Sequence, residues 1–182
     1  MEGVPVLRLI DIISSKGIVS RLKGSTRDEV IVELLEHLVE TGRLAEGDLQ
    51  DLVVEILKRE TLGSTGIGHG VAIPHIKTDK VNNFVGVLGV SREGIEFNSI
   101  DKEPVKVIIL FLSPVRAVSG HLQLLSHIGG ILRHQGYLSS LHDAETRDDL
   151  EELVRDAERM IFGIGPGGTD GPPPEGPDVA LA

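Results

Sequence analysis

The sequence has no cysteine and no tryptophan among its 182 residues, and aromatic side chains make up only 3% of it. Without cysteine the chain forms no disulfide, no thiolate metal site and no thiol nucleophile. The scarcity of aromatic side chains leaves little on which nucleic-acid bases could stack. A chain without cysteine suits a reducing compartment, and we expect a cytoplasmic protein.

Long apolar runs and an excess of positive charge are also missing. The longest apolar run, Val107–Leu112, is far shorter than the ~20 residues that cross a bilayer. The first residues lack the basic region that begins a signal peptide. The formal net charge of −10 opposes binding to phosphate backbones. We therefore expect neither a nucleic-acid partner nor insertion into a membrane.

Glycine and proline are concentrated at the carboxyl end of the chain. Residues 163–182 read GIGPGGTDGPPPEGPDVALA, which offers too few apolar side chains to offset the entropy of ordering. We expect a disordered tail over 163–182. The remaining residues, 1–162, are enough for one domain with its own hydrophobic core.

Hydrophobic periodicity before the tail predicts an α/β domain. The first long helix is expected after a capping box made by Thr26 and Glu29, and Gly42 should end it. The other segments with helical spacing are 49–57, 119–134 and 144–160. The segments typical of strands are 17–22, 71–75, 84–91 and 105–112. Their order predicts a three-layer α/β/α sandwich with a mixed sheet of about five strands.

A glycine-rich stretch, GSTGIGHGVAIPHIK, covers residues 63–77. It lacks the Gly-Lys-Ser/Thr ending of a Walker A loop. It also follows a helix and precedes a strand, whereas a dinucleotide fingerprint requires the reverse order. Two interpretations stay open for Gly63–Gly70. It is either a flexible connector or a loop whose glycines adopt positive φ and expose N–H groups to an anion or a partner.

His75 closes this stretch directly after a proline. Pro74 has a fixed φ and biases Ile73 away from helix, so the backbone aims the imidazole. If one ring nitrogen donates its proton to an acceptor, the other keeps a lone pair at neutral pH and can attack phosphorus. A metal site of His69, His75 and His121 is an alternative, but no H-E-x-x-H or Asp-rich pattern accompanies these histidines.

His121 lies in the first turn of a predicted helix, on the same face as apolar residues three, four and seven positions later. A helix N-terminus favours an anion, so His121 is either a neighbour of a phosphate or a hydrogen-bonded core histidine. The remaining histidines are expected to have no chemical role. His127 and His134 should be solvated, His37 should lie at the surface, and His142 should lie in a turn.

Two segments, RETLGSTGIGHGVAIPHIK and HLQLLSHI, resemble the fructose- and mannitol-type enzyme IIA (EIIA) domains of the bacterial phosphotransferase system (PTS). The resemblance includes the nitrogen-related regulatory branch and covers roughly Leu7 to Glu158. It implies that His75 accepts a phosphoryl group from the phosphocarrier HPr or its paralogue and passes it to an EIIB domain. It also implies that His121 contacts that group without accepting it, and that Arg59 lies near the same pocket.

Ser64, Thr65 and Gly66 are the candidate phosphate-binding residues of the loop, through their hydroxyl and N–H groups. No nucleotide or metal cofactor is required when the donor is itself a phosphohistidine. The chain departs from the family pattern at Ile76, where a small residue such as glycine is expected.

Two functions follow from the resemblance, and both use His75. The first is a phosphohistidine carrier in sugar uptake, and the second is a regulator whose phosphorylation state controls its binding to other proteins. We expect a freestanding chain without a fused IIB or IIC segment, which brings regulation nearly level with transport but leaves transport as the first interpretation. A scaffold that keeps only the fold is a third possibility, against which the pair of histidines and Arg59 argue.

Overall fold

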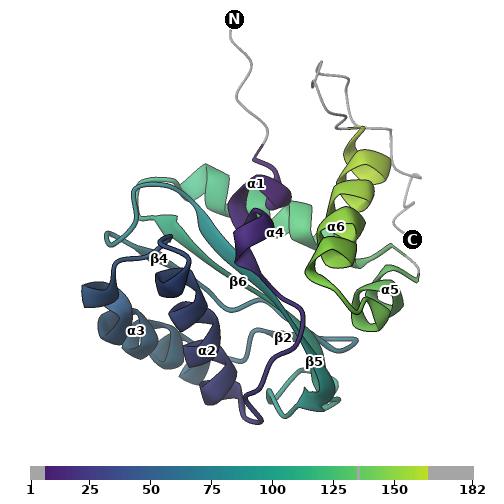
Figure 1. Ribbon diagram of the computed structural model, residues 1–182. Coiled ribbons are helices and arrows are strands. Elements are labelled where there is room, and N and C mark those ends of the chain that lie inside the picture. Colours follow the sequence, from purple (N-terminus) through teal and green to yellow (C-terminus); the bar gives the residue numbers. More distant parts are fainter. Residues whose placement is uncertain (1–6, 135, 164–182) are drawn as a thin grey trace, which may run out of the picture.

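Figure 1 presents the chain as a computed structural model, in which residues 7–134 and 136–163 are described here. The helices are α1 (Leu9–Ile13), α2 (Arg27–Glu40), α3 (Leu49–Thr61), α4 (Val118–Leu132), α5 (Tyr137–Asp143) and α6 (Arg147–Phe162), with short 3₁₀ turns η1 (Ser15–Gly17) and η2 (Glu46–Asp48). The strands are β1 (Ile18–Val19), β2 (Gly66–Gly68), β3 (Val71–Ala72), β4 (His75–Thr78), β5 (Val85–Ile95) and β6 (Val105–Pro114).

The strands form one mixed sheet of six strands, in the order β1-β5-β6-β3-β2, and β4 also pairs with β6. The β5–β6 and β2–β3 pairs are antiparallel, whereas β3 and β4 both run parallel to β6. The described residues thus contain six strands where about five are expected, because the glycine-rich stretch contributes β2 and a break before His75 makes β3 and β4 separate strands.

Helices cover both faces of the sheet, so the predicted three-layer α/β/α sandwich is confirmed (Figure 1). Strand β6 is at the centre and alternates between the two cores. Val107, Ile109 and Phe111 pack with α1, α4, α5 and α6. Ile108, Leu110 and Leu112 pack with α2 and α3. This double coverage explains why the run is apolar at nearly every position.

The prediction of one continuous strand over 71–75 is wrong. Strand β3 ends at Ala72 and β4 begins at His75, although both run parallel to β6. The interruption falls on Ile73 and Pro74, because a proline has no N–H to donate to a ladder. The Pro74 carbonyl still accepts a hydrogen bond from the N–H of Phe111 at 3.0 Å. The break therefore lies directly before the histidine.

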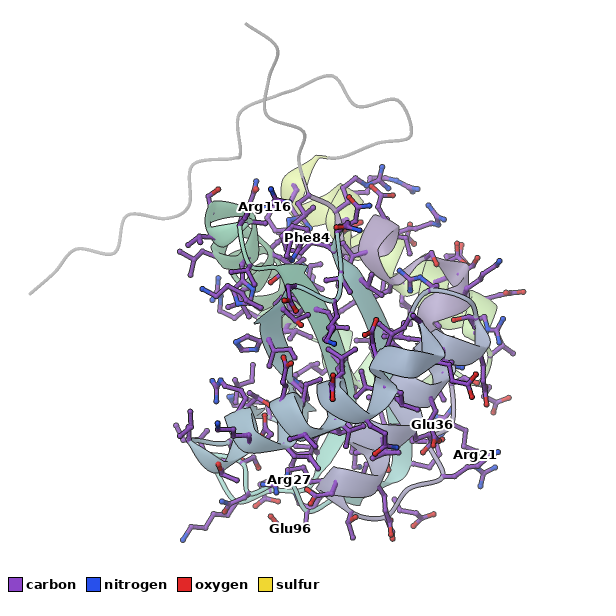
Figure 2. All side chains as sticks on the ribbon, turned by 90° about the vertical axis from the view of Figure 1, so that its left-hand side faces the viewer. Arg21, Arg27, Glu36, Phe84, Glu96 and Arg116 are labelled. Carbon is purple, nitrogen blue, oxygen red and sulfur yellow. The ribbon has the colours of Figure 1, made fainter. Side chains whose placement is uncertain are left out.

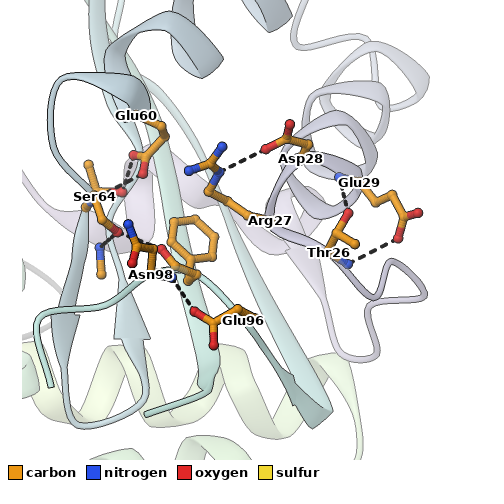
Figure 3. A network of polar contacts seen from close by, with 11 residues as sticks. Thr26, Arg27, Asp28, Glu29, Glu60, Ser64, Glu96 and Asn98 are labelled. Carbon is orange, nitrogen blue, oxygen red and sulfur yellow. Dashed lines mark hydrogen bonds and ion pairs between the residues drawn. The ribbon is translucent and has the colours of Figure 1, made fainter. Parts of the chain in front are cut away.

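Local signals at helix ends are confirmed, whereas short elements were missed. The Thr26–Glu29 capping box caps α2 in both directions, as Figure 3 shows. Helices α1 and α5, with 5 and 7 residues, are too short to display a helical period and were not predicted. The strand expected over 17–22 shortens to β1. The predicted tail lies outside the described residues, except for Gly163, which ends α6 with φ 64°.

Candidate functional site

His75 is the first residue of β4, and its register partner on β6 is Phe111. The two rings are stacked, with centroids 5.3 Å apart and planes inclined by 11°. The ring thus lies against the α4 side of the sheet. Ile76, the next residue, packs with the α2 and α3 core and is 8% exposed. Because side chains alternate along a strand, the Ile76 side chain enters the core on the face opposite the imidazole, although Ile76 also contributes to the lining of the hollow that contains His75.

The backbone fixes which nitrogen of His75 carries the proton. Nδ1 lies 2.6 Å from the carbonyl oxygen of Ile73. A carbonyl only accepts, so Nδ1–H donates and Nε2 keeps its lone pair in the neutral ring. Burial lowers the pKa of His75 below 6.5, and Arg59 and Lys77 lower it further, against the opposing effects of the Ile73 carbonyl and Glu60. The nucleophilic form is therefore favoured at neutral pH.

His121, in the first turn of α4, lies next to His75. The ring centroids are 5.3 Å apart with planes inclined by 57°, and His121 is 5% exposed. Burial, followed by the charges of His75 and Lys77, lowers its pKa to about 4, so the ring is neutral at pH 7. The burial of the ring agrees with the interpretation of His121 as a core histidine. Its position beside His75, the candidate acceptor, agrees with the interpretation as a neighbour of a phosphate.

Ser113 is a residue of this site that the sequence did not identify. It is fully buried near the end of β6, and its Oγ lies 2.6 Å from Nδ1 of His121 and 3.4 Å from the carbonyl oxygen of Ile76. A hydroxyl has one proton to give and also accepts. When it gives that proton to Nδ1, the neutral His121 ring carries its own proton on Nε2. The only sequence signal is a hydroxyl at the end of an apolar run.

Arg59 lies near the end of α3, and its Nη1 donates to the Gly63 carbonyl at 2.9 Å. It shares a hollow of about 440 Å³ with both histidines, and the complete lining is Glu55, Lys58, Arg59, Leu62, His75, Ile76, Lys77 and His121. Three cationic side chains and one carboxylate line this hollow, although the whole chain has a net charge of −10. The positive local balance suits a phosphoryl group.

A larger groove of about 760 Å³ runs along α2. Arg21 and Glu36, which are labelled in Figure 2, are among the residues that line it. Its charged lining is mainly carboxylate and includes Glu33 and Glu40. Carboxylates repel an anion, so we place the candidate phosphoryl site in the smaller hollow.

Ser64, Thr65 and Gly66 have hydrogen-bond partners within the protein. The Ser64 hydroxyl donates to the Phe97 carbonyl, Thr65 donates through N–H and Oγ1 to Glu60, and the Gly66 N–H donates to Ser64 Oγ. These three residues are not among those described above as lining the hollow. A phosphoryl group could reach these donors only if the bonds rearranged, and their assignment as phosphate ligands stays a prediction.

The glycine loop adopts the predicted positive φ at Gly68 and Gly70, with values of 93° and 75°. Between them, His69 also has a positive φ of 54°, and its N–H donates to Asp101 at 2.8 Å. The stretch is thus a hydrogen-bonded turn between β2 and β3, which agrees with the second of the two interpretations, a loop whose glycines adopt positive φ. Within residues 7–134 and 136–163, no cluster of three or more histidine and acidic side chains could hold a metal ion.

The prediction that His127 is solvated is wrong. Its ring is 5% exposed, its Nε2 lies 3.0 Å from Glu158, and it stacks on Phe162 with centroids 3.8 Å apart. Helix α6 covers this part of α4, and helical spacing alone could not show that a second helix packs there. His134 is exposed, as predicted.

Comparison with known proteins identifies the family of the chain. The sequence model described as "Phosphoenolpyruvate-dependent sugar phosphotransferase system, EIIA 2" matches residues 11–157. The PTS system fructose-specific EIIA component of Haloferax volcanii is 32% identical over 130 residues, which cover 71% of this chain and 83% of that protein.

None of the helices in the described residues is both long and apolar enough to cross a membrane. Solved structures give the same result as the sequence comparisons. The nitrogen regulatory protein IIA-Ntr of Neisseria meningitidis matches with a TM-score of 0.72 and 27% identity, over 79% of this chain and 97% of that one. The Escherichia coli complex of enzyme IIAMtl and phosphorylated enzyme IIBMtl matches in fold, with a TM-score of 0.64 and 23% identity over 76% of this chain and 94% of that one. The chain therefore belongs to the EIIA type 2 family of the phosphoenolpyruvate-dependent sugar phosphotransferase system.

Proposed function

We propose that the chain accepts a phosphoryl group on Nε2 of His75 from a phosphohistidine of HPr or its paralogue, and passes it to an EIIB domain. The observation that carries this proposal is the 2.6 Å contact between His75 Nδ1 and the Ile73 carbonyl. It holds the ring proton on Nδ1 and leaves the Nε2 lone pair for attack on phosphorus. Membership of the EIIA type 2 family supports the same reaction class.

The transfer exchanges one nitrogen–phosphorus bond for another. The Nε2 lone pair forms the new bond, and the electron pair of the broken bond returns to the donor's ring nitrogen. His75 keeps its Nδ1 proton, so its ring gains positive charge while the donor ring becomes neutral. No water, nucleotide or metal takes part in this exchange. The Ile73 carbonyl, as acceptor from Nδ1–H, stabilises the charge that develops on the ring.

Positive and hydrogen-bonding groups around the hollow would stabilise the transferring group, whose charge is spread over three oxygens. His121 would donate from Nε2 when Ser113 donates to its Nδ1. Arg59 and Lys77 would supply positive potential. Removing one such group typically slows transfer by about 10²–10³-fold when it contacts the transition state directly.

Phosphorylation by a reconstituted donor tests the acceptor. The protein is incubated with phosphoenolpyruvate, enzyme I and HPr, and acid-labile phosphate is counted per chain. We expect one phosphate in the wild type, none in His75→Ala, and retained but slower labelling in His121→Gln. His134→Ala, at an exposed histidine, is the matched control and should label like the wild type. Full labelling of His75→Ala would disprove the acceptor assignment.

Regulation is the second candidate function, favoured by the similarity to the nitrogen regulatory protein IIA-Ntr of Neisseria meningitidis. The two functions differ in where the phosphate goes next. Transfer from the phosphorylated chain to a fructose-type EIIB domain within seconds would support the carrier. Retention of the phosphate, together with a protein partner that binds only one phosphorylation state, would support the regulator.

A further inference from the structure

Glu60 is a buried carboxylate that the reaction described above does not use directly. It follows Arg59 near the end of α3 and is 3% exposed. Its Oε2 accepts from the Thr65 N–H at 3.1 Å, and its Oε1 accepts from the Thr65 hydroxyl at 2.5 Å. Figure 3 shows Glu60 beside the loop that carries Ser64. Both carboxylate oxygens are therefore committed to one residue of the glycine loop.

A continuous series of hydrogen bonds leads from this carboxylate to the imidazole of His75. The Thr65 carbonyl accepts from the Ile73 N–H at 3.0 Å. The Ile73 carbonyl in turn accepts from Nδ1 of His75 at 2.6 Å. Ile73 lies in the break between β3 and β4, where its N–H bonds to Thr65 and its carbonyl bonds to His75. Thr65 holds the Ile73 N–H, and Glu60 in turn holds Thr65.

We propose that Glu60 is a positioning residue for His75. Through Thr65 and Ile73 it orients the carbonyl that keeps the ring proton on Nδ1, and its negative charge favours the positive charge that the ring gains on phosphorylation. The second effect rests on the proposed function, whereas the first concerns the unphosphorylated protein.

A role confined to stability would have a different signature. A buried carboxylate that only anchors a loop would, when replaced, lower the free energy of unfolding and leave the folded site unchanged. A positioning residue also changes the His75 ring in the folded protein. Glu158 provides a matched control, because it is 1% exposed in α6 and accepts from Leu9 and His127 instead of from the loop.

The test compares Glu60→Gln with Glu158→Gln. Glutamine keeps the size and one acceptor but removes the charge. In protein labelled with ¹⁵N-histidine, the chemical shifts of Nδ1 and Nε2 report which nitrogen of His75 carries the proton and at what pH the ring titrates. We expect Glu60→Gln to lower the pKa of His75 and to slow its phosphorylation about five- to tenfold. Glu158→Gln should leave both within about twofold of the wild type.

The hydrogen-bonding step is tested separately at Thr65. Thr65→Val removes the hydroxyl, and we expect part of the His75 population to move its proton to Nε2, whereas Thr65→Ser restores the wild-type spectrum. If Glu60→Gln does not fold, the two Thr65 variants still test the proposal. Unchanged ring nitrogens and unchanged rates in both Glu60→Gln and Thr65→Val would overturn the proposal. The nitrogen measurement needs no donor, so a wild type that takes up no phosphate would refute the proposed function alone.

Discussion

The buried position of His121 predicts a specific dependence of stability on pH. Burial, and then the charges of His75 and Lys77, lower the pKa of His121 to about 4, whereas a histidine in the unfolded chain titrates near 6.5. Between these two values the unfolded state binds a proton that the folded state does not. The free energy of unfolding therefore falls as the pH falls. The contribution of His121 is complete above pH 6.5 and is lost progressively toward pH 4.

The size of the effect follows from the shift. Each pH unit between the two pKa values changes the free energy of unfolding by ~1.4 kcal/mol, so the step from pH 7 to pH 5 corresponds to ~2 kcal/mol at most. The hollow that His121 lines is open to solvent, and solvent screening reduces this difference. We therefore expect about 1 to 2 kcal/mol from His121.

Urea unfolding at pH 7 and pH 5 measures this contribution when the wild type is compared with His121→Gln. Glutamine keeps a polar side chain but does not titrate, so the variant should lose about 1 to 2 kcal/mol less than the wild type over this step. Effects of other titrating groups largely cancel in the comparison. His134→Gln is the matched control and should follow the wild type. If wild type and His121→Gln lose equal stability, His121 does not exclude its proton and the stated cause is wrong.

Three further changes test separate contacts. Ser113→Ala removes the hydroxyl beside Nδ1 of His121, and single-turnover phosphorylation should slow about tenfold; an unchanged rate would show that the hydroxyl does not set the ring proton. Gly66→Ala would place a Cβ 2.6 Å from the Cβ of Ser99, and urea unfolding should show a loss of about 1 to 3 kcal/mol unless the loop moves freely. Thr26→Ala removes the cap of α2, and the midpoint of thermal unfolding should fall by the equivalent of ~1 kcal/mol, whereas an unaltered midpoint would mean that the cap is dispensable.

Features that depend on neighbouring residues could be read from the sequence. The cap of α2 depends only on Thr26 and the residue three positions later. The almost wholly apolar composition of β6 indicates that both of its faces are buried. The order of elements then determines the fold class, because short connections leave few ways to cover one sheet. The break at Pro74 was also available from a local rule, since a proline cannot donate to a ladder.

Features that depend on distant partners could not be read in this way. His127 looks solvated when only α4 is considered, because its contacts with Glu158 and Phe162 come from a helix about thirty residues further along the chain. Spacing along one helix states which residues share a face, but not which face another helix covers. The burial of His121 was predictable because its apolar neighbours marked its face as inward.

Polar residues inside an apolar pattern are the signal that would have identified the remaining parts of the site. Glu60 falls four residues after Ile56, on the buried face of α3, and Ser113 ends the apolar run of β6. A search for apolar positions alone takes such residues as the end of the buried face. A polar group that is buried without a hydrogen-bond partner, however, destabilises the protein. Glu60 and Ser113 therefore each require a hydrogen-bond partner elsewhere in the fold. In this chain the partner of Ser113 is His121 itself, and the partner of Glu60 is Thr65, in the loop that leads to His75.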